Sequence, residues 1–451
     1  MTERRDSQRH REMGLETVGD LALHVILTKL GPEDTARTAC VSKRLWASAS
    51  EEFLWSRFCL QDLDLFTPLD PQGNPSPSFK ASYRTWRECF GMYPWPLVKR
   101  VKRCWDRLKN WLATYFPEAE ATLCKGASED QVEELENILM VKLPLPTRIL
   151  YRFCDGQDLR GQDSPTSVAG SLLGLIGGYS FYQHLVNVYL LPLEQVVVAT
   201  EQITGFSSKI EYILVAGSST STDKYFFLNC TNGQLYVGTK NYLLDGEMIP
   251  CVPNSLINSV HDFSGNNQQD GMLLWLEEHA NRLEKGIIKI REGDFRSICQ
   301  FPEVPPLCST AVTNNVKIRA SAVFVPEYSD PYDGSEKYWF AYSIRMSLLP
   351  KGCIINGMSF SSCQLYLRHW IIRAHDVVVS EVNAEAVIGR HPLLQPGEKE
   401  FIYESCTPLP APSGSVEGAF AFVPGRLADP KGGPFPVEVG QFPLQLPEYI
   451  F

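Results

Sequence analysis

The spacing of apolar residues changes along this chain, and this change constrains the fold more than any other feature. Residues 15–59 read as a compact set of helices, and in the middle region Val98, Val101, Trp105, Leu108 and Leu112 recur at three- and four-residue steps, which predicts one face of a helix. From Pro302 onward the repeat becomes two: Tyr338, Phe340 and Tyr342 alternate with Trp339 and Ala341. Similar runs at 364–373, 401–405, 416–423 and 435–442 predict an antiparallel β-sandwich. The fold class is therefore multidomain α+β.

The length and the charge limit the class of protein further. A chain of 451 residues exceeds one hydrophobic core, so we expect about three domains. Its formal net charge of −10 argues against a general nucleic-acid binder. The 13 cysteines form no CxxC pair, which favours reduced thiols in the cytoplasm or the nucleus. The polar N-terminus is not a secretory signal, and no apolar run is long enough to span a bilayer.

The order of predicted elements gives the domain boundaries. We expect a disordered tail at 1–14, a helical segment at 15–60 and a Pro-rich linker at 61–80. An α+β domain at 81–290 begins with helices, continues with strands from 172 to 237 and closes with a helix near Met272–Leu283. The β-sandwich covers 300–445. Gly31 and Pro32 should separate two helices of the first segment.

The first predicted helix is apolar on nearly every side. Leu21, Ala22, Leu23, Val25, Ile26, Leu27 and Leu30 leave it without a polar face. A segment of about 45 residues can bury little of its own surface, so something else must cover this helix. Either another part of the same chain or a separate protein does so. The Pro-rich segment that follows favours a separate protein.

The first 60 residues resemble an F-box. Ile26, Leu27, Leu30, Asp34, Val41, Ser42, Lys43 and the pair Leu54–Trp55 stand in matching places. The resemblance implies binding to the Skp adaptor and, through it, to a cullin. Carried over by position, the residues expected to face the adaptor are Val18, Ile26, Leu27, Leu30, Val41 and Leu45. Two positions depart from the pattern: Gly19 replaces a proline, and Leu45, with Trp46 beside it, replaces an aromatic residue.

The middle region resembles the SUKH superfamily of Smi–Knr-like domains. The resemblance rests on 126–136, 142–146, 150–157 and 174–180, which read GASEDQVEELE, KLPLP, LYRFCDGQ and GLIGGYS. We expect Asp155, Gly156 and Gln157 to be structural, Gly156 to end a helix, and Tyr179 and Tyr182 to be core residues. Ser128 and Gln131 have the spacing of a capping box. The basic face of the helix near 98–112 should be solvated rather than a nuclear address.

The last region resembles the ApaG domain, a sandwich of fibronectin type. CQLYLRHWIIR at 363–373, VIGRHPLLQPGEKEFIYESC at 387–406 and PSGSVEGAFAFV at 412–423 carry the resemblance. Bacterial relatives have a glycine-rich turn proposed to hold phosphate. Here the turn reads NAEAVIG, and only Gly389 is kept, so we expect no phosphate site. A family of plant F-box proteins and an animal one share the order of F-box, SUKH and ApaG domains.

No catalytic motif accompanies these domains. The sequence has no GxSxG, GxxxxGK[ST], HExxH or strand-associated GxGxxG pattern. His369 and His391 are expected to be structural, and we predict no catalytic residue, no metal site and no cofactor. The resemblance to F-box proteins implies the non-catalytic substrate-recognition subunit of a Skp–cullin–F-box ubiquitin ligase, with an unknown protein target. The alternatives are a stand-alone binding scaffold and an enzyme acting through the sandwich on a phosphate ester.

Overall fold

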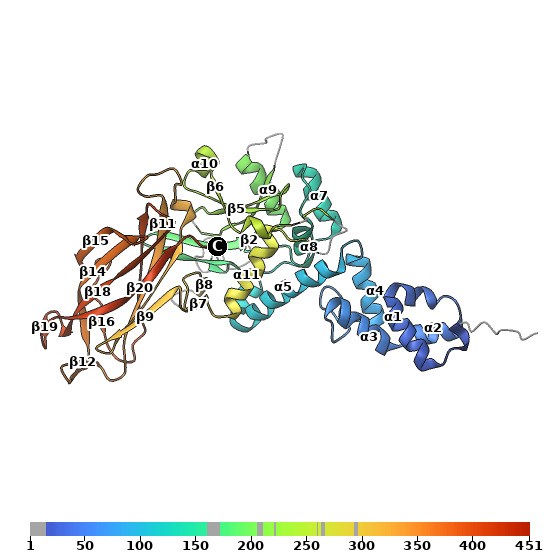
Figure 1. Ribbon diagram of the computed structural model, residues 1–451, viewed down its shortest axis with the longest axis horizontal. Helices are drawn as coiled ribbons and strands as arrows, with labels where there is room; N and C mark the ends of the chain where they lie inside the picture. The colour runs from blue at the N-terminus through green and yellow to red at the C-terminus, as the bar shows by residue number, and fades with distance from the viewer. Residues whose placement is uncertain are drawn as a thin grey trace, which may run out of the picture. The chain divides into compact units, whose positions relative to one another are not determined.

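The computed structural model describes residues 15–159, 172–204, 211–220, 222–258, 260–262, 267–292 and 296–451. The expected tail at 1–14 lies outside these residues. The described chain divides into two compact units, one reaching Arg103 and the other starting at Cys104 (Figure 1). We call them the helical unit and the large unit. Helical, mixed and all-β regions follow one another along the chain, which confirms the multidomain α+β class.

The helical unit is built from short helices. They are η1 (Leu15–Thr17), α1 (Asp20–Thr38), α2 (Lys43–Ala49), α3 (Glu52–Leu63), α4 (Phe79–Phe90) and the first part of α5 (Trp95–Tyr115). The predicted break at Gly31 and Pro32 is confirmed, because Gly31 has a φ of 81° and interrupts α1. The Ser42 side chain accepts the N–H of Leu45 and so caps α2.

The segment at 61–80 is not the loose linker that its prolines predict. The backbone oxygen of Leu69 accepts hydrogen bonds from the Ser82 hydroxyl and, at 2.9 Å, from Trp86 Nε1. The Tyr83 hydroxyl donates to Asp62 at 2.7 Å. These bonds tie the segment to α4, and so the helical unit continues through it.

The large unit begins with helices that support a mixed sheet. The helices are α6 (Pro117–Glu120), α7 (Glu129–Leu139), α8 (Leu145–Phe153), α9 (Leu193–Thr204), α10 (Tyr242–Asp245), η3 (Asn254–Leu256) and α11 (Gly271–Glu284). The predicted capping box is confirmed: Ser128 accepts the N–H of Gln131, and the Gln131 side chain accepts the N–H of Ser128. The closing helix is α11, and its inner side chains are buried.

The sheet of this part has the order β6-β5-β4-β3-β2-β1-β8-β7 among the described strands. Its strands are β1 (Gly177–Phe181), β2 (His184–Leu190), β3 (Tyr212–Ser218), β4 (Tyr225–Asn229), β5 (Leu235–Gly238), β6 (Met248–Pro250), β7 (Lys289–Arg291) and β8 (Ser297–Cys299). The predicted turn at 231–233 joins β4 and β5, which pair antiparallel.

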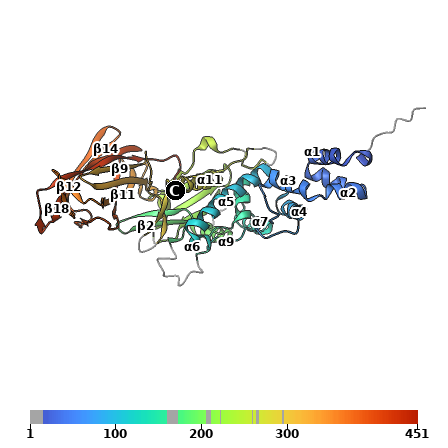
Figure 2. The ribbon, with the colours of Figure 1, turned by 90° about the horizontal axis from the view of Figure 1, so that it is seen from below.

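Two further sheets form the predicted sandwich, and β14 and β11 belong to different layers of it (Figure 2). The first sheet has the order β17-β11-β10-β9, and in the second β15, β14, β18 and β20 are neighbours. Short strands β12, β13, β16 and β19 and the turn η4 (Pro326–Tyr328) complete it. The bounds are β9 (Cys308–Thr313), β10 (Val316–Phe324), β11 (Tyr338–Leu348), β12 (Cys353–Ile355), β13 (Met358–Phe360), β14 (Cys363–Ala374), β15 (Val377–Glu385), β16 (Leu393–Leu394), β17 (Phe401–Leu409), β18 (Ser413–Arg426), β19 (Asp429–Pro430) and β20 (Phe435–Gln445).

A buried polar cluster joins the mixed sheet to the sandwich inside the large unit. Glu327 of η4 accepts hydrogen bonds from the Tyr179 hydroxyl at 2.7 Å and pairs with His184 Nε2 at 2.9 Å. Lys224 Nζ lies 3.5 Å from the same carboxylate. The prediction that Tyr179 is a core residue is confirmed, whereas Tyr182 is 70% exposed and reaches the Ser405 hydroxyl instead.

The residues Asp155, Gly156 and Gln157 hold the mixed domain together, as expected. The buried Gln157 side chain donates to Leu173 O at 3.0 Å and accepts from Leu175 N at 2.6 Å. The Asp155 carboxylate accepts the N–H of Leu193 at 2.8 Å. Helix α8 ends at Phe153, before Gly156, so the glycine is required by a close approach rather than by the helix end.

Replacing Gly156 with alanine should lower the free energy of unfolding by about 3 kcal/mol. Its φ is 67°, and a Cβ would lie 2.7 Å from Leu190 O. Gly246→Ala is the matched control, because φ is 70° there and no atom lies within 4 Å of the added Cβ. The control should lose only about 1 kcal/mol. Urea unfolding of both variants measures the difference, and equal losses would contradict the packing argument.

The stability of the large unit should depend on pH through His279. This ring is fully buried and pairs with Leu175 O, and burial, helped by the charge of Arg282, lowers its pKa to about 3. In the unfolded chain the ring takes up a proton near pH 6.5. Because folding lowers the pKa of this base, the protonated ring favours the unfolded chain. The stability associated with the neutral ring is therefore complete above about pH 6.5 and is lost as the pH falls toward 3.

We therefore expect the melting temperature of the natural chain to fall more steeply between pH 6.5 and 4 than that of His279→Gln. Glutamine keeps a side-chain N–H for Leu175 O and does not titrate. Thermal melts of both proteins across this pH range give the comparison. Parallel pH profiles would show that His279 is not the group responsible.

Candidate functional site

Large apolar side chains are exposed on α1, α2 and α3 of the helical unit and in the turn between α1 and α2. We call this set the apolar surface, and its members are Leu21 (83% exposed), Val25 (54%), Leu30 (40%), Val41 (71%), Trp46 (60%) and Phe53 (63%). Single exposed apolar side chains are ordinary, but a concentration on three short helices is typical of a protein-binding surface.

A small core of buried side chains packs between the helices that carry the apolar surface. Leu23, Leu27, Leu45, Ala49, Leu54 and Trp55 are buried. The Thr35 hydroxyl donates to Leu27 O at 2.8 Å across the break in α1, and Trp55 Nε1 donates to Ala49 O at 2.7 Å. Arg44 donates to Asp20 at 2.7 Å and so joins α2 to the start of α1. The apolar surface therefore rests on a rigid support.

The six residues predicted to face an adaptor fall into three groups. Leu30 and Val41 are exposed, Val18 and Ile26 are half-buried, and Leu27 and Leu45 are buried. In this structure Leu27 and Leu45 support the helices rather than forming the surface. The residue beside Leu45, Trp46, is the exposed one of the two. Direct contact of these six side chains with an adaptor stays a prediction.

Leu21, Val25 and Phe53 are exposed but are not among the six residues that the motif predicts to face the adaptor, although Leu21 and Val25 belong to the helix predicted to be apolar on nearly every side. The sequence does indicate that some of these side chains are exposed, because a short helix that is apolar on every side cannot bury all of its apolar residues. Choosing which ones requires the packing of α1 against α2 and α3, and that packing is not a property of one helix.

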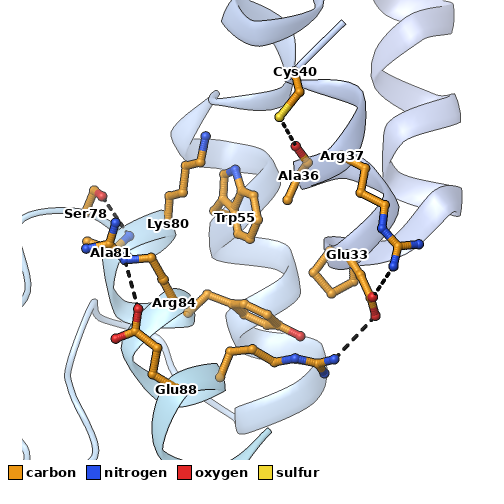
Figure 3. Close-up of a pocket in the computed structure, with 13 residues that line it drawn as sticks. Glu33, Ala36, Arg37, Cys40, Trp55, Ser78, Lys80, Ala81, Arg84 and Glu88 are labelled. Atoms are coloured by element: carbon orange, nitrogen blue, oxygen red, sulfur yellow. Dashed lines mark hydrogen bonds and ion pairs between the residues drawn. The ribbon is translucent and has the colours of Figure 1, made fainter.

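A groove of about 710 Å³ lies beside these helices (Figure 3). Trp55 lies in it, with Lys80 Nζ 5.6 Å from the centre of the indole ring. On one wall Glu33 pairs with Arg37 at 2.7 Å and with Arg87 at 3.3 Å. Its mixture of an aromatic ring and paired charges suits an amphipathic partner segment rather than a reacting small molecule.

Comparison with known proteins gives the family. A family model described as the ApaG domain matches residues 326–424. Over 444 residues the chain is 59% identical to F-box protein SKIP16 of Arabidopsis thaliana. The aligned residues are 97% of this chain and 100% of that protein. The chain belongs to the F-box proteins of this type. The expected combination of a helical F-box region and an ApaG sandwich is thereby confirmed.

Other relatives cover most of the chain or its sandwich. F-box only protein 3 of Homo sapiens is 25% identical over 409 residues, which are 90% of this chain and 79% of that one. Protein ApaG of Nitrosomonas europaea is 35% identical over 136 residues, 30% of this chain and 94% of its own. A crystal structure of an ApaA protein from Bordetella pertussis covers 30% of this chain and 98% of its own, with 33% identity and a TM-score of 0.25. The SUKH assignment of the middle region stays a prediction.

Two cysteines and two histidines of this F-box protein are held by burial or by hydrogen bonds. Burial raises the pKa of the thiols of Cys59 and Cys154 to about 12, so both stay protonated at neutral pH. His369 pairs with Glu381 at 2.9 Å on the sandwich surface, and His391 Nδ1 pairs with Leu365 O at 3.1 Å. Among the described residues, no group of three or more His, Cys, Asp or Glu side chains could hold a metal ion.

Basic side chains of α5 form ion pairs within each unit, so this face of the helix is not simply solvated. Lys99 and Arg103 lie 2.9 and 2.6 Å from the Asp64 carboxylate. Arg107 donates to Glu284 at 2.6 Å. No helix in the described part of the chain combines the length and the apolar character that crossing a membrane requires.

Proposed function

We propose that this F-box protein is the substrate-recognition subunit of a Skp–cullin–F-box ubiquitin ligase. The observation that carries the proposal is the apolar surface on α1, α2 and α3 of a chain that is 59% identical to F-box protein SKIP16. Covering these side chains with an adaptor removes apolar area from water, at about 25 cal/mol per Å². The Skp adaptor would in turn connect the chain to a cullin.

In this proposal the chain contributes binding and no bond-making residue. The helical unit attaches to the ligase, and the large unit holds a target protein. Holding a target lysine near a charged conjugating enzyme raises its effective concentration, which accelerates transfer without new catalytic groups. The 13 cysteines are free thiols, which fits work in the cytoplasm or the nucleus.

Reconstitution tests the proposal directly. The full chain is mixed with a purified Skp adaptor and the N-terminal half of a cullin, and the mixture is separated by size-exclusion chromatography. We expect the three to elute together, and the cullin to associate with the chain only when the adaptor is present. A chain that elutes alone in both mixtures would support the alternative, a stand-alone binding scaffold.

A further inference from the structure

Strand β15 lies at the edge of the second sandwich sheet. It pairs antiparallel with β14 on one side, and it is the terminal strand of its sheet in the described chain. An edge strand presents backbone N–H and C=O groups without partners, and these can pair with another extended chain.

Two other edge strands of the sandwich, β17 and β20, are protected. Strand β17 contains Pro408 and receives hydrogen bonds from the mixed domain, including Ser180 to Glu404 at 2.5 Å. Strand β20 contains Pro436 and Pro443, and its Gly440 carbonyl accepts the Ser309 hydroxyl of β9 at 2.7 Å. Prolines and covering contacts are how sheet edges avoid unwanted pairing. Among the described residues β15 contains no proline, and the one bulge in its ladder lies opposite Ile372 and Arg373, so Glu381 to Glu385 keep a regular register.

The register of β15 identifies the backbone groups that point outward. Ala386 N donates to Tyr366 O at 3.0 Å, so this pair is a hydrogen-bonded one. Hydrogen-bonded and non-hydrogen-bonded pairs alternate in an antiparallel ladder. The pairs of Glu385 with Leu367, Asn383 with His369 and Glu381 with Ile371 are therefore of the second kind. Their N–H and C=O groups on β15 point away from β14.

The side chains along β15 also favour a partner. Val377, Val378 and Val379 are 68%, 46% and 44% exposed. From Ala374 to Ala386 the sequence has no lysine, arginine or proline, the residues that most often block an edge. Glu381, whose carboxylate also pairs with His369 of β14, and Glu385 are exposed on one face of the strand. An added strand continues both faces of β15, so basic side chains would complement these two carboxylates.

We propose that β15 is a docking edge, which receives an extended, basic segment of a target protein as an additional strand of the sheet. Backbone hydrogen bonds to Glu381, Asn383 and Glu385 hold the segment, and its lysines or arginines face the two carboxylates. This docking edge deepens the proposed function. Calling its partner a target protein rests on that proposed function.

The test uses the full chain and a fluorescent probe peptide, acetyl-Lys-Val-Lys-Val-Lys-Val-Lys-amide. The control peptide carries N-methyl groups on alternate amides, which remove one hydrogen-bonding edge and keep the charge. We expect anisotropy titrations to show binding at least tenfold tighter for the unmodified peptide. Glu381→Pro should reduce it tenfold or more, because proline removes an outward N–H and leaves the ladder to β14 intact. Should this variant misfold, Glu381→Lys with Glu385→Lys provides a second one with the same expectation.

Three results would overturn the proposal. The unmodified peptide does not bind, or the N-methylated peptide binds equally well and charge alone explains the binding. The third is a concentration-dependent dimer of the full chain that Glu381→Pro abolishes, which would make the occupant a second copy. Adaptor binding by Glu381→Pro is measured alongside, because a failure of the proposed function would appear there and not in the peptide titration.

Discussion

Replacing Phe451 with alanine is expected to lower the free energy of unfolding of the large unit by about 4 kcal/mol. The Phe451 ring stacks on Trp275 of α11, with ring centres 5.5 Å apart and planes at 14°. The Arg282 guanidinium lies 4.5 Å from the centre of the same ring. The end of the described chain lies beside α11 in both ribbon views (Figures 1 and 2).

Backbone bonds hold the same segment in place. Trp275 Nε1 donates to Ile450 O at 2.7 Å, Ile450 N donates to Cys251 O at 3.0 Å, and Lys224 Nζ donates to Phe451 O at 2.8 Å. The segment that follows β20 therefore fills part of the core of the mixed domain. Losing the ring leaves a cavity against Trp275, which is the reason for the large expected effect.

Denaturant unfolding followed by tryptophan fluorescence measures this effect. Tyr332→Ala is the matched control, because that ring is 84% exposed and its loss should change stability by less than about 0.5 kcal/mol. A double-mutant cycle with Trp275→Ala should show a coupling energy of about 1 kcal/mol or more. A loss below about 1 kcal/mol for Phe451→Ala would contradict the anchoring of the segment.

The second large effect concerns the apolar surface. Leu30→Asp together with Val41→Asp should weaken binding of the Skp adaptor at least 100-fold, which is about 2.7 kcal/mol. Both side chains are exposed, at 40% and 71%, so the chain itself should fold normally. In the complex, however, two carboxylates would be buried against an apolar partner without a counter-charge. Calorimetric titration of adaptor into each protein measures the change.

A control with the same chemical change lies in the large unit. Leu243 and Leu244 of α10 are 74% and 84% exposed, and Leu243→Asp with Leu244→Asp adds the same two charges. This variant should bind the adaptor as tightly as the natural chain. If both double variants lose affinity equally, net charge rather than the apolar surface explains the loss.

The fold could be predicted where the decisive interactions are local. The capping box of Ser128 and Gln131 and the break at Gly31 depend on residues within a few positions of one another, and both were found from the sequence. The strand at Tyr338–Leu348 followed from its period of two, although the structure buries both of its faces between Phe340 and Met346.

The predictions that differ from the structure have a common cause. At these positions the structure is determined by contacts between residues that are not close in the sequence. Prolines at 61–80 indicated a linker, but bonds from Ser82 and Trp86 to Leu69 fix the segment on α4. Tyr182 looked like a core residue, yet it leaves the mixed sheet to meet Ser405 of the sandwich. For Leu27 and Leu45 contact with the adaptor stays a prediction; the structure shows that both are buried, because helix packing decides which apolar side chains stay outside.

Hydrogen–deuterium exchange of the full chain with and without the Skp adaptor tests whether the helical unit binds the adaptor. We expect the adaptor to slow exchange of amides in α1, α2 and α3, between Asp20 and Leu63. Amides of the sandwich, from Cys308 to Gln445, should exchange at unchanged rates. Protection confined to the large unit, or no protection with a saturating adaptor concentration, would contradict the assignment of the helical unit as the adaptor-binding part.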